Sequence, residues 1–151
     1  MRGKGGLAAA VAACLLVTLV SAQSAEAKRI RYSGETSQHH TIALRTNAKG
    51  KVQRIAIVFD AKCRKGRVDN GIQYFYAPFD KAGYRSFSDH AGFSQKFPES
   101  GTKGKFRVRV FGRRVSRERI RGTFDWKGKY FYKGKKYTAC RIRTVHWSVS
   151  R

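Results

Sequence analysis

Lysine and arginine recur at every second position in parts of the C-terminal half of this 151-residue chain. One run occupies alternate positions of 103–109, and another occupies alternate positions of 117–121. Alternate side chains of a β-strand share one face at a spacing of roughly 6.8 Å, so neighbouring strands of this kind would form a cationic surface. Such a surface suits a repeating polyanion. We therefore expect a polyanion-binding site at Lys105, Arg107, Arg109, Arg119, Arg121, Arg141 and Arg143.

The overall charge favours the same class of ligand. The chain carries 33 Lys and Arg against 9 Asp and Glu, a formal net charge of +24. A surface of this charge attracts nucleic acid, wall polymers, acidic polysaccharide and anionic membrane surfaces without distinguishing among them. Two noncatalytic interpretations stay open. The cations bind an anionic polymer or surface, or they form the solvated face of a structural cell-envelope domain.

Histidines and carboxylates offer a catalytic alternative, a small secreted nuclease or hydrolase. In RNA cleavage, a carboxylate and a histidine can exchange protons with the substrate while an arginine stabilises the phosphorane charge. No Gly-x-Ser-x-Gly nucleophile elbow occurs, and the candidate residues have no diagnostic spacing. We therefore expect no catalytic centre. The candidates are Glu35, His39, His40, His90, Glu99 and His146.

Metal and cofactor sites are not expected either. Adjacent His39 and His40 cannot complete a tetrahedral metal site without further ligands. The cysteines are better used in a disulfide than as metal ligands. We expect a monomer without metal or cofactor.

The N-terminus has the pattern of a signal peptide over residues 1–27. Arg2 and Lys4 precede an apolar run at 7–20, and Ala-Glu-Ala at 25–27 forms a small-residue cleavage site. The apolar run has 14 residues, whereas a membrane-spanning helix needs about 20. Lipidation at Cys14, in Val-Ala-Ala-Cys, is an alternative. We expect cleavage after Ala27 and a secreted or envelope-associated chain.

Removal of the signal peptide on export would change the net charge and the number of cysteines. Without Arg2, Lys4 and Glu26, the mature chain has 31 basic and 8 acidic residues, a net charge of +23. Its cysteines are Cys63 and Cys140, and an oxidising compartment favours their pairing over two free buried thiols. A disulfide closing so long a loop would stabilise the fold by about 4–5 kcal/mol in the chain-entropy model.

Strand patterns supply the elements that would position these residues. Residues 54–63 alternate with period two, which places Ile57, Phe59 and Cys63 on one face. Residues 106–111 and 119–126 alternate in the same way. Residues 138–149 predict a last strand with a bulge near 143–144, because Cys140 and Trp147 have opposite parity. Residues 79–101 predict two short strands with loops.

Glycine turns separate short strands at intervals of roughly ten residues, and the mature chain has no convincing helical period. This pattern predicts an all-β fold in a single basic domain at 28–151, preceded by a signal-peptide helix. The fold would be an antiparallel β-sandwich or barrel of about 7–9 short strands. The core is expected to hold Ile55, Ile57, Phe59, Phe106, Val108, Val110, Phe124, Trp126 and Trp147.

Several short motifs together resemble a group of small exported bacterial all-β domains of unknown function. They are Tyr-Ser-Gly-Glu-Thr-Ser-Gln at 32–38, Asp-Ala-Lys-Cys at 60–63, Gly-Lys-Phe at 104–106, Arg-Gly-Thr-Phe at 121–124, Cys140 and Val-His-Trp at 145–147. The resemblance spans nearly the whole mature chain. It implies an all-β domain with the two cysteines paired, and it implies no activity.

Overall fold

Ten β-strands make up the fold of residues 29–151, the part of the chain that the computed structural model describes. The expected signal peptide and Cys14 lie outside these residues. The predicted all-β antiparallel fold is confirmed, and the two-residue β5 brings the strands to ten within this range. The strands are β1 (Ile30–Thr36), β2 (Thr41–Thr46), β3 (Val52–Cys63), β4 (Val68–Tyr76), β5 (Lys81–Ala82), β6 (Ser86–Phe97), β7 (Thr102–Arg114), β8 (Arg119–Tyr132), β9 (Lys135–Arg141) and β10 (Val145–Ser150).

Helical structure is limited to two short 3-10 segments, η1 (Arg64–Gly66) and η2 (Pro98–Ser100), within the described range. Neither segment is long or apolar enough to cross a membrane, and the described residues contain no other helix. Backbone hydrogen bonds therefore come mainly from strand pairing, with others in the turns.

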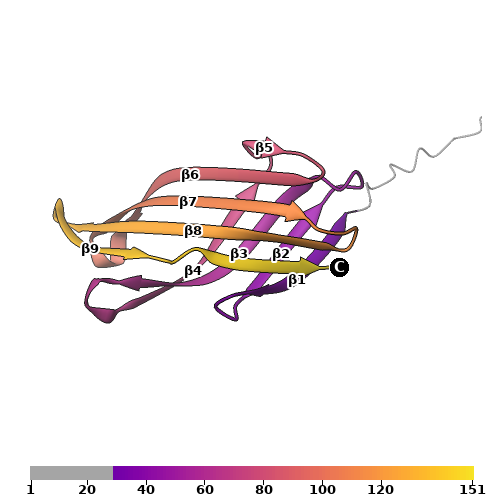
Figure 1. The fold of residues 1–151 in the computed structure, drawn as a ribbon. Coiled ribbons are helices and arrows are strands. Elements are labelled where there is room, and N and C mark those ends of the chain that lie inside the picture. The colour runs from indigo at the N-terminus through magenta and orange to yellow at the C-terminus, as the bar shows by residue number, and fades with distance from the viewer. Residues whose placement is uncertain (1–28) are drawn as a thin grey trace, which may run out of the picture.

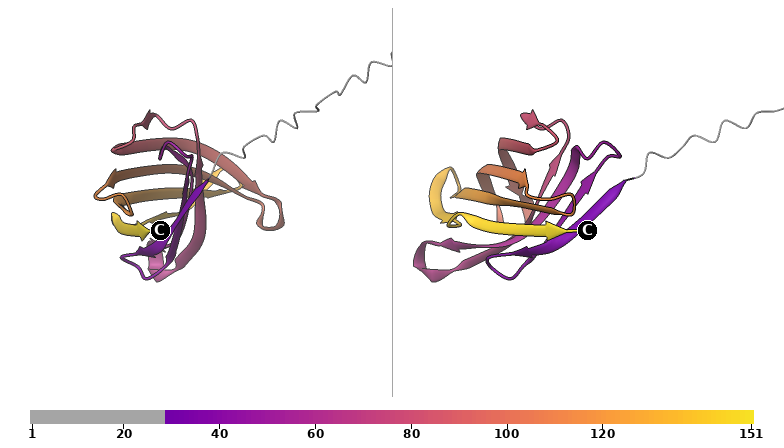
Figure 2. Two further views of the ribbon diagram at one scale, coloured as in Figure 1. Left: turned by 90° about the vertical axis from the view of Figure 1, so that its right-hand side faces the viewer. Right: turned by 45° about the vertical axis from the view of Figure 1, so that its right-hand side comes forward.

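The strands form one antiparallel sheet in the order β10-β1-β2-β3-β9-β8-β7-β6-β5, with β4 added to β3. The sheet folds over itself, because β10 pairs with both β1 and β8. The result is sandwich-like, with β1 to β4 in one layer and β6 to β8 in the other (Figure 1). β9 and β10 join the layers, since each pairs with one strand from either side (Figure 2).

The core lies between the two layers. All nine core residues predicted from the sequence are buried, and none is more than 6% exposed. The Phe59 ring of β3 lies 5.3 Å from the Phe124 ring and 5.2 Å from the Trp126 ring of β8, centroid to centroid. These contacts hold the first layer against the second.

Two glycines make room for a large ring on the β7–β8 hairpin. Gly112 and Gly122 face each other across it. A Cβ atom on Gly122 would collide with the Trp147 ring and with the carbonyl oxygen of Phe111. Trp147 therefore packs directly on backbone, a close approach that only glycine permits.

Two sequence-based expectations about the strands are wrong in detail. Residues 86–97 form one long strand, β6, because this segment pairs along β7 without interruption. Residues 138–149 are divided between β9 and β10 instead of forming one bulged strand. The break between the two strands allows both Cys140 and Trp147 to be buried despite their opposite parity.

The predicted disulfide between Cys63 and Cys140 is present. The two cysteines are register partners where β3 pairs with β9, a contact that involves only Lys62–Arg141 and Cys63–Cys140 among the described residues. The bond closes a sequence separation of 77 residues and fixes a junction between strands that otherwise share few hydrogen bonds.

Candidate polyanion-binding site

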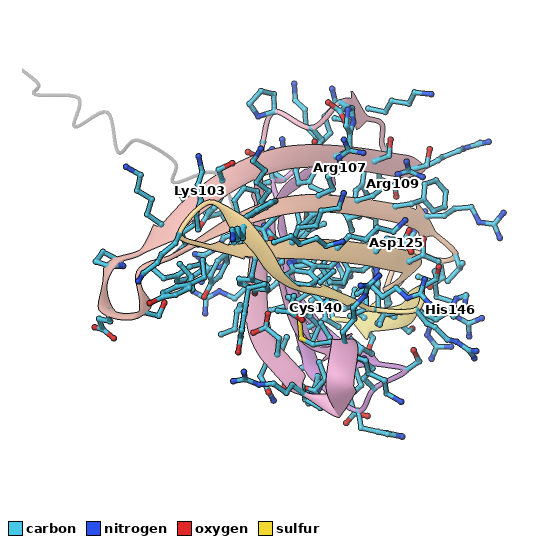
Figure 3. All side chains as sticks on the ribbon, turned by 90° about the vertical axis from the view of Figure 1, so that its left-hand side faces the viewer. Lys103, Arg107, Arg109, Asp125, Cys140 and His146 are labelled. Carbon is cyan, nitrogen blue, oxygen red and sulfur yellow. A yellow bond between two sulfur atoms is a disulfide. The ribbon has the colours of Figure 1, made fainter. Side chains whose placement is uncertain are left out.

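The cations of β7 lie on the outer face of the sandwich. Along this strand the even-numbered side chains from Phe106 to Val110 are buried, while Lys105, Arg107 and Arg109 are exposed. Figure 3 shows Lys103, Arg107 and Arg109 projecting outward from the same strand. The predicted parity of this cationic strand is therefore confirmed.

Strand register extends the cations of β7 into a row across four strands. Arg107 of β7 is opposite Lys127 of β8, and Lys127 is opposite Arg141 of β9. Arg141 is in turn opposite Lys62 of β3. Neighbouring strands are about 4.8 Å apart, so this cationic row (Arg107, Lys127, Arg141 and Lys62) brings four charges from distant parts of the chain together.

A groove of about 1110 Å³ lies along part of the row, beside the disulfide. We call it the cationic groove. Its lining includes Gln38, Asp60 and the two bonded cysteines. Lysine and arginine dominate its charge, with six of them among its described lining residues: Lys62, Arg64, Lys127, Lys129, Arg141 and Arg143.

Carboxylates leave these six cations uncompensated. Among the side chains that the structure describes, the one Lys or Arg within 4.0 Å of a carboxylate is Arg151, which contacts Glu118 away from the groove. Asp60 lines the groove, but its carboxylate lies 2.8 Å from His40 Nε2 and accepts a hydrogen bond of 2.8 Å from Asn70 Nδ2. Gln38 Nε2 donates a hydrogen bond to the backbone carbonyl of Asp60 at 2.7 Å, and the backbone N–H of Asp60 donates to Gln38 Oε1 at 3.1 Å. The groove is consequently a site of strong positive potential.

The seven residues expected from the sequence are all exposed, but they do not form one cluster. Arg141 and Arg143 line the groove, and Arg107 is opposite Lys127 at its edge. β7 and β8 are antiparallel neighbours, yet Arg109 is opposite Asp125 instead of another arginine. Arg119 and Arg121 lie further along β8, opposite Ser150 and Ser148 of β10.

The sequence-based site missed Lys62, Arg64, Lys127 and Lys129, which the groove gathers. Lys127 would have been found only with the correct turn, since pairing outward from Arg114 and Ile120 places it opposite Arg107. Lys62 and Arg64 flank Cys63, so the predicted disulfide with Cys140 was the signal that would have placed them beside Arg141.

Aromatic side chains interrupt the cationic face. Phe111 follows Arg109 on the outer side of β7 and is 44% exposed. The ammonium nitrogen of Lys105 lies 5.6 Å from the centroid of the Phe131 ring. The Phe75 ring is buried in the core, and Tyr130 is partly buried.

The residues of the catalytic alternative are distributed over separate places. His40 contacts Asp60, whereas His90 is paired with Asp80 at the β5–β6 edge. His146 is exposed on β10, opposite Thr123. Near His90, burial and the neighbouring Asp80 carboxylate raise the pKa of Asp89. His40, through Asp60, is close to the cationic groove.

Within the part of the chain that the structure describes, one group of potential metal ligands occurs, at the disulfide. The side chains of Cys63, Asp69 and Cys140 bring their ligand atoms within 4.8 Å of one another. Metal binding by cysteine requires thiolate sulfur, and both sulfurs are engaged in the disulfide. This group therefore offers one carboxylate in the oxidised protein.

Comparison with protein-family models, curated proteins and solved structures finds no match to this chain. The resemblance to exported β-domains thus stays a prediction. Function has to be inferred from the charge and shape of the groove.

Proposed function

We propose that this chain is an exported, noncatalytic binder of anionic polymers, and that the cationic groove with the outer face of β7 and β8 is its contact surface. Export is supported by the signal-peptide pattern of residues 1–27 and by the disulfide, since such bonds persist in oxidising compartments. Binding is supported by the surface itself.

The observation that carries the proposal is the uncompensated charge of the groove. Six cations line it, and none of them is among the ion pairs of the described residues. Like charges held at neighbouring-strand spacing repel one another, so bringing them together costs free energy that a polyanion would recover. Exposed Phe111 adds a ring on which a base or sugar could stack.

The sheet geometry suits an extended polymer better than a small anion. The cationic row crosses four strands, and the run from Lys103 to Arg109 follows β7 at a right angle to it. A chain with repeated phosphate, sulfate or carboxylate groups can occupy several of these positions at once. Each neutralised phosphate of a nucleic acid also releases a counterion, which strengthens binding at low salt.

Binding to a panel of polymers tests the proposal. The panel comprises duplex DNA, single-stranded RNA, heparin and lipoteichoic acid, with dextran as an uncharged control, each at about 50 and 200 mM salt. We expect the charged polymers to bind and their affinities to fall steeply with salt. Absence of binding to every charged polymer at the lower salt would contradict the proposal and favour a structural envelope domain.

A matched pair of variants locates the surface. Lys127→Gln with Arg141→Gln removes two charges from the groove, and Arg31→Gln with Arg45→Gln removes two from register partners on β1 and β2. Both doubles have the same net charge. We expect only the groove double to weaken binding; equal losses would mean that net charge, not the groove, determines affinity.

The nuclease alternative retains one supporting observation, the contact of His40 with Asp60 at the groove. It is tested by incubating the protein with labelled single-stranded RNA. The proposal predicts intact RNA. Cleavage that His40→Ala abolishes would replace binding by catalysis as the function of the groove.

A further inference from the structure

A second depression shares the disulfide as part of its wall, and its chemistry differs from that of the cationic groove. It has a volume of about 500 Å³. We call it the tyrosine pocket. Its wall carries aromatic, hydroxyl and carboxylate groups from four segments of the chain: Asp69, Ser100, Thr102, Tyr130, Tyr132 and Tyr137.

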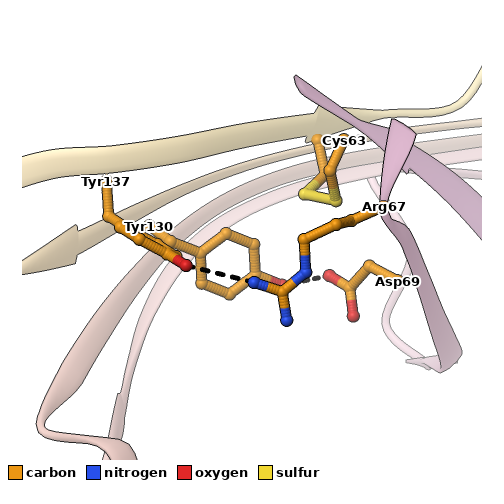
Figure 4. The surroundings of a disulfide bond; sticks show 6 residues. Cys63, Arg67, Asp69, Tyr130 and Tyr137 are labelled. Atoms are coloured by element: carbon orange, nitrogen blue, oxygen red, sulfur yellow. Dashed lines mark hydrogen bonds between the residues drawn. A yellow bond between two sulfur atoms is a disulfide. The ribbon is translucent and has the colours of Figure 1, made fainter. Parts of the chain in front are cut away.

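Hydrogen bonds from the β4 side of the pocket hold two of the tyrosines. Tyr130 Oη donates to Asp69 Oδ2, and Arg67 Nη1 donates to Tyr137 Oη at 3.1 Å (Figure 4). Burial and the Asp69 carboxylate both raise the pKa of Tyr130, so its hydroxyl stays protonated and continues to donate. The second oxygen of Asp69 is left to accept hydrogen bonds from a ligand.

Apolar surface surrounds the opening of the pocket. Tyr137 is 60% exposed, Val68 is 55% exposed and Tyr132 is 46% exposed, and all three line the depression. Beside them, the hydroxyls of Ser100 and Thr102 lie 2.6 Å apart and are hydrogen-bonded to each other. Clustered exposed apolar residues next to polar groups are typical of ligand-binding surfaces.

The pocket is close to neutral, in contrast to the groove. Among its described lining residues the charged groups are Arg67 and Asp69, and each already contacts a tyrosine. A charged ligand would gain little net attraction here. A neutral ligand with hydroxyl groups and an apolar face would match both the rings and the hydrogen-bonding groups.

We propose that the tyrosine pocket binds a neutral saccharide, with a pyranose ring packed on Tyr132 or Tyr137 and its hydroxyls bonded to Asp69, Ser100 and Thr102. A pyranose presents C–H groups on its faces and hydroxyls around its edge, which is the combination that the pocket offers. The volume of about 500 Å³ lies within the usual range for small-ligand sites and accommodates one or two sugar rings. This site is independent of the polyanion-binding function proposed above.

Titration with cellotetraose, maltotetraose and chitotetraose, followed by amide shifts in ¹H–¹⁵N NMR spectra, tests the proposal. We expect at least one of them to shift the amides of Asp69, Thr102 and Tyr137 with a Kd on the order of 1 mM or below. The affinity should not change with salt, because the probes carry no charge.

Three variants assign the binding to the pocket. Asp69→Asn and Tyr137→Ala should each weaken it by about tenfold, equivalent to about 1.4 kcal/mol. Tyr76→Ala is the matched control. Tyr76 is the last residue of β4 and is 57% exposed, similar to Tyr137, but it lies outside the pocket. This variant should bind as the wild type does. Tyr137 is largely exposed, so its variant should fold normally even if Asp69→Asn does not.

Two results would overturn the proposal. One is the absence of shifts for all three saccharides at about 10 mM, which excludes affinity in the expected range. The other is binding that Tyr76→Ala weakens as much as Tyr137→Ala does, because the saccharide would then contact exposed tyrosines without using the pocket.

Discussion

The cationic groove and the tyrosine pocket share a disulfide but present different chemistry. The groove takes Lys127 and Lys129 from β8, whereas the pocket takes Tyr130 and Tyr132 from the same strand. Period-two alternation separates the two sets, because successive side chains of a strand point to opposite faces. One strand can therefore supply a charged site on its outer face and a nearly neutral site on its inner face.

The groove and the pocket also differ in how their side chains are held. Tyr130 and Tyr137 are fixed by hydrogen bonds to Asp69 and Arg67. The cations of the groove, by contrast, are in none of the ion pairs of the described residues, so their side chains can adjust to a flexible polymer. We expect the pocket to discriminate among ligands by shape and the groove to discriminate mainly by charge.

Removing the disulfide should have the largest effect, because it would disturb the wall that both regions share. Cys63→Ser with Cys140→Ser should lower the free energy of unfolding by about 4–5 kcal/mol, given the long loop that the bond closes. Urea denaturation of the variant and the wild type measures this difference. A loss below about 1 kcal/mol would show that β3 and β9 are held together without the bond.

The core under both regions should give the next largest effect. Phe59→Ala should cost about 3–5 kcal/mol, since the ring is 3% exposed and contacts Phe124 and Trp126. Ile72→Ala is the control, because Ile72 is 56% exposed on neighbouring β4 and its loss should cost no more than about 0.5 kcal/mol. Similar losses for the two variants, measured by urea denaturation, would contradict the packing of the two layers described above.

The sequence predicted local features better than long-range ones. The outward parity of Arg107 and the burial of Phe59 follow from period-two alternation within one strand. The disulfide was predictable because export leaves two cysteines. The meeting of Lys62 with Arg141 follows from the disulfide and not from any strand pattern. The meeting of Asp69 with Tyr130 depends on how distant strands align, which no local pattern encodes.

An irregularity in strand pairing also escaped the sequence. The pairing of β8 with β9 shifts register after Tyr130, so that Thr138 is opposite Tyr130 and Lys136 is opposite Phe131. Tyr137 is the extra residue on β9. Bulges of this kind redirect side chains, and this one helps to place Tyr137 on the tyrosine pocket.

Tyr130→Phe should have a smaller, pH-dependent effect on the pocket side alone. It removes the hydrogen bond to Asp69 and should cost about 1 kcal/mol at neutral pH. The raised pKa of Tyr130 favours the neutral phenol in the folded state, so its contribution is complete below about pH 10 and is lost as pH rises further. The stability difference between the variant and the wild type should therefore shrink above that pH in urea denaturation. A difference that stays constant to about pH 11 would mean that burial and Asp69 do not raise this pKa.

The salt dependence of duplex DNA binding tests the central claim most directly. Log affinity should fall with log salt by roughly 0.9 for each phosphate that a cation neutralises. Lys127→Gln with Arg141→Gln should flatten this slope by up to about two units, while Arg31→Gln with Arg45→Gln leaves it unchanged. An unchanged slope in the groove double, or wild-type binding that is insensitive to salt, would contradict the assignment of polyanion binding to the cationic groove.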